Sequence, residues 1–142
     1  MKVSGFLLFI LIFSGFFGSR CEATVYNSNG SAANVQQIHD TQAVDGDTIT
    51  LPLGTFSWST HVTITKGITI QGQTAVNSDT GVCEDRTILQ DSFAAGYPGG
   101  EGFFHCTANT GQFLRITGLT FTNAPGNTAV QANGTIRVDE CL

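Results

Sequence analysis

Residues 45–73, which read DGDTITLPLGTFSWSTHVTITKGITIQGQ, decide the fold class of this chain. Apolar and polar side chains alternate here in short runs, so that Ile49 and Leu51 would face one side of a strand and the threonines between them the other. A period of two residues is typical of a strand with one buried face. The segment predicts four short strands, at residues 48–51, 55–58, 61–64 and 67–70.

The chain keeps this character after residue 73. Glycine, threonine, asparagine and β-branched residues dominate, and glycine recurs at the ends of the apolar runs. Short strands separated by regular turns indicate a sandwich, a barrel or a solenoid. Five further strands are predicted, at residues 87–90, 113–117, 119–122, 129–131 and 135–138.

Two features favour the solenoid. Residues 67–72, GITIQG, and residues 114–121, LRITGLTF, are variants of one unit in which an alternating strand meets a glycine at a corner. In addition, no Asn-Gly or Asp-Gly pair joins two matched strands, as the turns of antiparallel hairpins favour. Stacked turns, each pairing with the next, explain this pattern better than a meander.

One helix precedes the strands. Ala33, Val35 and Ile38 lie near helical spacing, with polar residues on the other face, so we expect a helix over residues 31–44. Either Ser31 or Asn34 could cap its start. The Asp45-Gly46 turn would end it.

The order of these elements resembles a known family. A helix with NVQQI at 34–38, then VDGDTITLPLGTF at 44–56, then KGITIQG at 66–72, resembles the start of the pectin-lyase-like right-handed parallel β-helix superfamily, its N-terminal portion. The resemblance covers residues 34–142 and implies an all-β solenoid with an N-terminal capping α-helix. It also implies inward ladders of apolar side chains in turns about 4.8 Å apart. Residues 24–33 would form a polar lead-in.

The end of the sequence leads to a further expectation. Residues 135–142, TIRVDECL, resemble a turn that has just begun, with no polar capping segment after it. Solenoids need capped ends to stay soluble. We therefore expect the solenoid to be truncated at its C-terminus, with further turns of the same chain after Leu142.

Residues 1–23 read as a secretory signal peptide. Lys2 precedes an apolar stretch at residues 3–17, and small residues follow, which fits cleavage after Ala23. The stretch is shorter than the roughly 20 residues of a membrane span. An uncleaved anchor is the alternative, and Arg20 disfavours lipidation of Cys21. The protein is therefore expected to be secreted or at the cell surface, with no membrane contact beyond this segment.

The charge of the chain excludes one class of partner. The net charge is −5, and cleavage would make it more acidic, because it removes Lys2 and Arg20 but only one acidic residue, Glu22. Binding to nucleic acid needs clustered lysine and arginine, so we expect no nucleic-acid partner.

Three cysteines, Cys83, Cys106 and Cys141, follow the predicted signal peptide. An oxidising compartment permits a disulfide. We would pair Cys83 with Cys106, which lie in glycine-rich segments, and treat Cys141 as a small buried apolar residue. Three unpaired thiols remain the alternative. No Cys-x-x-Cys is present, which disfavours a zinc site.

No catalytic, cofactor-binding or metal-binding residue is assigned. The densest charged cluster consists of Glu84, Asp85, Arg86 and Asp91, and it could bind calcium. The resemblance also makes calcium a candidate cofactor. A solvated loop with an internal ion pair explains the cluster more simply. Asp45 and Asp47 are expected to bond backbone groups of the turn around Gly46.

Asp139 and Glu140 lack visible partners. The three histidines, His39, His61 and His105, lack a visible nucleophile or carboxylate, and His39 would lie on the exposed or capping face of the helix.

Arginines and aromatic residues are candidates for sugar binding. Arg115 and Arg137 occupy equivalent places in two strands, where they could line a groove for an anionic sugar or simply face outward. Trp58, Tyr97, Phe103 and Phe104 could stack on sugars, although packing over the end of a turn is the simpler role. Of the adjacent pair Phe103 and Phe104, we expect one to be exposed. Asn29 and Asn133 begin glycosylation acceptor patterns.

Function follows here from the resemblance. It implies an exported protein that binds or cleaves polysaccharide, as pectate lyases and polygalacturonases do. Whether this chain is an enzyme stays open, because no catalytic motif of the family is visible and one fold hosts many functions. The alternative is a non-catalytic cell-surface or adhesion protein on the same scaffold.

Overall fold

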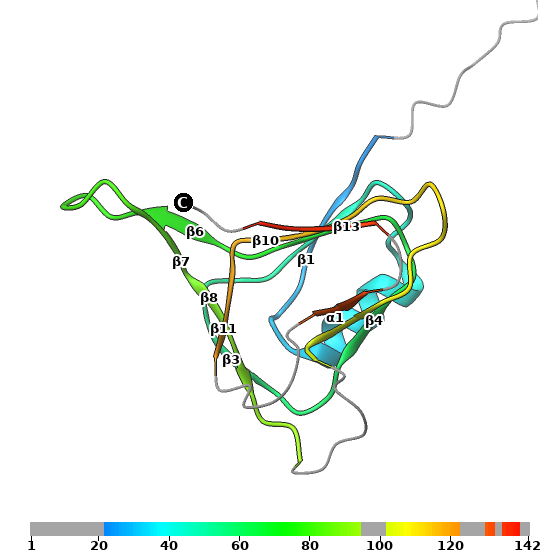
Figure 1. The fold of residues 1–142 in the computed structure, drawn as a ribbon, viewed down its shortest axis with the longest axis horizontal. Helices are drawn as coiled ribbons and strands as arrows, with labels where there is room; N and C mark the ends of the chain where they lie inside the picture. Colours follow the sequence, from blue (N-terminus) through cyan, green and yellow to red (C-terminus); the bar gives the residue numbers. More distant parts are fainter. Residues whose placement is uncertain (1–21, 95–101, 123–129, 133–134, 140–142) are drawn as a thin grey trace, which may run out of the picture.

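The computed structural model describes residues 22–94, 102–122, 130–132 and 135–139. It is mostly β, with one short helix and several parallel sheets (Figure 1). Each strand has three to five residues. The elements are β1 (Val25–Asn27), α1 (Ala32–Thr41), β2 (Thr48–Thr50), β3 (Gly54–Trp58), β4 (Val62–Ile64), β5 (Thr69–Gln71), β6 (Thr74–Val76), β7 (Cys83–Asp85), β8 (Thr87–Asp91), β9 (Phe104–Cys106), β10 (Leu114–Thr117), β11 (Leu119–Thr122), β12 (Val130–Ala132) and β13 (Ile136–Asp139).

Three parallel sheets form the body. Sheet A has the order β1-β2-β5-β10-β13, sheet B the order β11-β8-β3, and sheet C the order β12-β9-β4. The chain visits the sheets in rotation, passing through β2, β3 and β4, then β5, β8 and β9, then β10, β11 and β12, before it returns to sheet A with β13. Successive passes of the chain therefore pair strand on strand in parallel.

The core consists of side chains stacked in register from turn to turn. Ile49, Ile70 and Ile116 are partners in sheet A and are each at most 1% exposed. Phe56, Leu89 and Phe121 align in sheet B, and Val62, Phe104 and Val130 align in sheet C. The predicted ladders of inward apolar residues are confirmed.

All nine predicted strands have a counterpart, with bounds that differ by at most two residues. Four strands were missed: β1, β6, β7 and β9. Each has three residues and no apolar–polar–apolar alternation of aliphatic side chains. The segment expected to be a polar lead-in thus contains β1, which pairs with β2.

Helix α1 begins where the sequence indicated and ends earlier. Ser31 is the N-cap, and its hydroxyl accepts the Asn34 N–H at 3.3 Å. The helix stops at Thr41 rather than at Val44, because the backbone of Gln42 leaves the helical region (φ −127°, ψ −52°). Val35 and Ile38 are buried in the core, as expected.

Polar side chains of α1 bond to the free edge of β4. The Gln36 amide accepts the Thr63 N–H at 2.7 Å and donates to the Thr63 carbonyl at 3.2 Å, as a neighbouring strand would. His39 Nε2 accepts the Thr65 N–H at 3.1 Å. His39 is only 3% exposed, so of the two expected placements the capping face is confirmed; the expectation that it lacks a carboxylate partner is wrong, because its Nδ1 lies 2.7 Å from Asp40 Oδ1. These bonds satisfy backbone groups that an open edge would leave unpaired.

A close glycine contact forms the corner between sheets A and B. A Cβ added at Gly72 would lie 2.0 Å from the Gly118 carbonyl oxygen, and Gly118 itself has φ +67°. No larger residue fits at Gly72 unless the backbone moves. At Gly72 and Gly118, the glycine therefore reflects the close approach of successive turns.

Strands β6 and β7 form an antiparallel hairpin that projects from the body (Figure 1). It is joined by a loop in which Asn77 Oδ1 accepts the Asp79 and Thr80 N–H groups. No matched hairpin was expected from the sequence, because the turn between β6 and β7 contains no Asn-Gly or Asp-Gly pair.

The predicted Cys83–Cys106 disulfide is wrong. Cys83 is disulfide-bonded, but Cys106 is a free thiol that is 1% exposed. Cys106 points inward from β9, where burial raises its pKa to about 12. Cys106 therefore plays the small apolar role that we expected of Cys141, which lies outside the described residues.

Residues 1–21, with most of the predicted signal peptide, also lie outside the described residues. Within the part of the chain that the structure describes, no helix is long and apolar enough to cross a membrane.

Candidate binding surface

The outer face of sheet A carries two columns of polar side chains. Alternation places the residues between the buried isoleucines on the outside, and parallel pairing aligns them from turn to turn. The first column is Thr48, Thr69, Arg115 and Arg137, and the second is Thr50, Gln71, Thr117 and Asp139. We call this set of eight residues the sheet A face.

Two arginines on this face share one carboxylate. Arg115 donates to both Asp139 oxygens, at 3.0 and 2.7 Å, and Arg137 lies 3.2 Å from Asp139 Oδ2. The hydrogen bond from Arg115 lowers the pKa of Asp139, and the same bond raises the pKa of Arg115. The equivalent placement of the arginines is confirmed, since they are register partners that face outward. Neither is a free cation, and ionised Asp139 is a poor proton donor.

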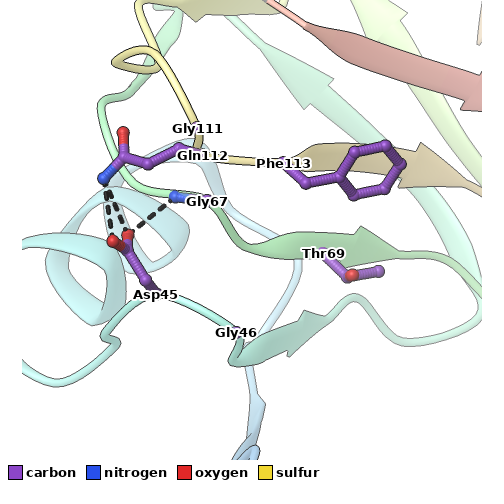
Figure 2. A pocket seen from close by; sticks show the side chains of 7 residues that line it. All are labelled: Asp45, Gly46, Gly67, Thr69, Gly111, Gln112 and Phe113. Carbon is purple, nitrogen blue, oxygen red and sulfur yellow. Dashed lines mark hydrogen bonds between the residues drawn. The ribbon is translucent and has the colours of Figure 1, made fainter.

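A trough of about 420 Å³ lies at the amino ends of β5 and β10 (Figure 2). Figure 2 shows Asp45 and Gln112 on one side of it and Phe113 and Thr69 on the other, with glycine backbone between them. The lining residues are Asp45, Gly46, Gly67, Thr69, Gly111, Gln112 and Phe113.

Hydrogen bonds from two other turns hold the Asp45 carboxylate in place. Gln112 Nε2 donates to both oxygens, at 2.9 and 3.0 Å, and the Gly67 N–H donates to Oδ1 at 2.8 Å. The bond from Gln112, followed by that from Gly67, lowers the pKa of Asp45. Asp47, 1% exposed, accepts the Thr24 and Val44 N–H groups. The prediction that the aspartates bond backbone groups of the turn around Gly46 is confirmed for Asp47, through Val44, and is wrong for Asp45, whose partners lie on other turns.

Phe113 stands at the rim of the trough with 55% of its surface exposed. It directly precedes β10, in the outward phase of the alternation that buries Leu114 and Ile116. Phe113 is not among the aromatic residues that the sequence pointed to as candidates. The period-two pattern of residues 113–117 was a signal that could have found it.

A smaller pocket of about 220 Å³ lies at the carboxyl ends of the same strands. Polar groups of the sheet A face line it together with the glycines of the corner. Thr69 of the trough and Arg115 of this pocket are register partners. The trough, the sheet A face and the small pocket therefore form one strip across the molecule.

The aromatic residues singled out in the sequence do not contribute to this strip. Trp58, Phe103 and Phe104 are each at most 1% exposed, and Trp58 Nε1 donates to the Gly30 carbonyl at 2.9 Å. The expectation that one of Phe103 and Phe104 is exposed is wrong, because Phe103 precedes β9 at a bend and packs on Phe121 with ring centroids 5.3 Å apart. Tyr97 lies outside the described residues.

The remaining candidates form no site with the strip. Arg86 pairs with Glu84 at 3.2 Å, which is the internal ion pair that the simpler interpretation predicted. His61 and His105 pack edge to face on sheet C, with centroids 6.1 Å apart. Among the described residues, no three His, Cys, Asp or Glu side chains gather as metal ligands. Glu140 and Asn133 lie outside the described residues.

Comparison of the chain with protein-family models, curated proteins and solved structures found no match.

Proposed function

We propose that this chain forms turns of a right-handed parallel β-helix, capped by α1, in an exported protein that binds polysaccharide on the strip along sheet A. The rotation of the chain through three parallel sheets and the in-register ladders support the β-helix. The side-chain bonds from α1 to the edge of β4 support the capping role.

Two observations support export. The first 23 residues have the pattern of a signal peptide. Cys83 is disulfide-bonded, and structural disulfides belong to oxidising compartments.

The observation that carries the binding function is the exposed ring of Phe113 beside preorganised polar groups. Ligand pockets combine apolar or aromatic surface with a few placed polar groups. The strip offers both, on strands held in register by hydrogen bonds, so little ordering is needed when a ligand binds. Its length across several strands suits an extended polymer.

Binding, rather than acid-catalysed hydrolysis, is the activity that the strip supports. Asp139 is engaged by two arginines, and Asp45 by Gln112 and Gly67. A glycosidase needs one carboxyl group that stays protonated to act as an acid. Both of these carboxyl groups have lowered pKa values.

The test is affinity electrophoresis of the full chain through gels that contain neutral or acidic polysaccharides, with and without calcium. A reducing-end assay on the same polymers measures cleavage separately. We expect retarded migration in at least one polymer and no release of reducing ends. If no polymer retards the chain, the binding function is wrong, and the non-catalytic adhesion protein becomes the better hypothesis.

A further inference from the structure

We infer that the trough between Asp45 and Phe113 holds a neutral pyranose ring and discriminates against acidic sugars. This inference rests on the proposed polysaccharide binding and adds the chemical class of the sugar and the place where it binds.

The trough has room for a sugar ring. Its volume of about 420 Å³ falls within the range of small-molecule pockets, roughly 300–1,000 Å³. A Cβ added at Gly46 or Gly111 would meet no atom within 4 Å, so the space above both glycines is open. Backbone rather than side chains forms this part of the trough.

Phe113 offers the ring an apolar surface. One face of a pyranose exposes C–H groups, and removing these and the phenyl ring from water together is favourable. The phenyl ring is already 55% exposed in the free protein, so no rearrangement is needed to present it. Stacking here would leave the hydroxyl groups of the sugar at the edges of the ring, toward the polar residues of the trough.

Asp45 and Gln112 can bind those hydroxyl groups. A carboxylate has about four acceptor positions, and Gln112 and Gly67 occupy three of those of Asp45. The remaining position can accept a sugar O–H, and a hydrogen bond to a charged acceptor is stronger than one between neutral groups. Because Gln112 and Gly67 orient the carboxylate, its position is set before the sugar arrives.

The charges around the trough disfavour an acidic sugar. Asp45 is ionised at neutral pH, and the chain carries a net charge of −5. After the bond from Gln112, the charge of Lys66 also lowers the pKa of Asp45, but the Lys66 ammonium donates to the His39 and Ala43 carbonyls near the end of α1. Arg115 and Arg137 are neutralised in part by Asp139. A sugar carboxylate would thus face an unpaired negative charge, which a neutral ring avoids.

The experiment measures affinity electrophoresis of the full chain and of point variants in soluble galactan, β-glucan, mannan and polygalacturonate. We expect a neutral polymer to bind, with less than about a twofold change between 50 and 500 mM NaCl, since no ion pair with the ligand is screened. Phe113→Ala should weaken binding by about tenfold or more. Phe113→Tyr should stay within about threefold, because it keeps the ring face.

Leu53→Ala is the matched control. Leu53 is an exposed apolar residue (73%) that lies outside the strip, so its loss should leave binding unchanged. Should Phe113→Ala fail to fold, Phe113→Leu keeps an apolar side chain, removes the flat ring and should give the same loss.

Three outcomes would overturn the inference, and they separate it from the proposed function. Tighter, salt-sensitive binding of polygalacturonate contradicts the neutral sugar while polysaccharide binding stands. A neutral polymer that binds equally well to the Phe113→Ala and Phe113→Leu variants places the sugar elsewhere. Failure of every polymer to bind contradicts both.

Discussion

The three parallel sheets and the β6–β7 hairpin are built from equally short strands, yet they differ in what their side chains meet. Every second residue of β2, β5 and β10 is buried against the next turn, as Ile49, Ile70 and Ile116 are. In the hairpin, Val76 and Val82 remain 67% and 52% exposed. The difference teaches that stacking of successive turns, and not strand propensity, stabilises these short strands.

The comparison is tested most strongly in the core. Ile70→Ala removes a fully buried side chain between Ile49 and Ile116, and should lower the free energy of unfolding by about 2–5 kcal/mol. Val76→Ala in the hairpin should change it by less than about 0.5 kcal/mol. Urea denaturation followed by circular dichroism measures both. Equal losses would show that the hairpin is as important to stability as the stack.

Glycines sharpen the same contrast. Gly72→Ala places a methyl group against the Gly118 backbone and should cost about 1–3 kcal/mol or more. Gly81, in the hairpin loop, has φ +69° but open space around a Cβ, so Gly81→Ala should cost about 1 kcal/mol for the left-handed conformation alone. Thermal unfolding of the two variants would rank them. A smaller effect at Gly72 than at Gly81 would contradict the close approach of the turns.

The edge of β4 is the third test, because α1 protects it with a side chain rather than with a strand. Gln36→Ala leaves the Thr63 N–H and carbonyl without their partner and should cost about 1–2 kcal/mol. Gln37→Ala, exposed on the same helix, is the control and should be nearly neutral. Hydrogen exchange at Thr63 gives a local readout, and unchanged protection in Gln36→Ala would refute the proposed pairing.

The smallest expected effect concerns pH. The pKa of Asp45 is lowered from its usual value of 3.8 in the folded chain, first by the bond from Gln112. The resulting stabilisation is complete above the unfolded value and disappears as the pH falls through the lower folded value. Because Asp45 is exposed, it should amount to less than about 1 kcal/mol.

Asp45→Asn measures that contribution. The difference in urea midpoint between wild type and variant should be constant above about pH 5 and shrink toward pH 3. If the difference in urea midpoint between wild type and Asp45→Asn grew as the pH fell, the Asp45 carboxylate would destabilise the folded chain.

Alternation predicted the sheets but not the hairpin, and the reason is visible in single residues. Ile49 and Ile70 show the period of two because each has a buried inner side. Strand β7, Cys83–Asp85, is half-buried throughout and has no apolar period to detect. Strand β9, Phe104–Cys106, is central to sheet C but was not predicted, since its inward residues are a phenylalanine and a cysteine rather than β-branched aliphatic residues.

The candidate strip was only partly predictable. Arg115 and Arg137 were identified as equivalent positions, and the structure places them side by side. Their sharing of Asp139 depends on the register of two turns 24 residues apart, which no local pattern contains. The aromatic residues proposed to stack on sugars, such as Trp58 and Phe104, are instead buried. Large apolar rings are more favourably buried wherever the core has space.

By itself, the sequence determined the local elements, which are the nine alternating strands and the start of the helix, since propensity, period and capping act over a few residues. Tertiary structure alone decided which outward side chains meet. Asp45 and Gln112 are 67 residues apart and come together because two further passes of the chain bring their corners into contact. Tertiary structure also decided that Cys106 is buried and forms no disulfide, and that Phe113 is exposed beside an open trough. Such contacts depend on register between turns, which is a property of the whole stack.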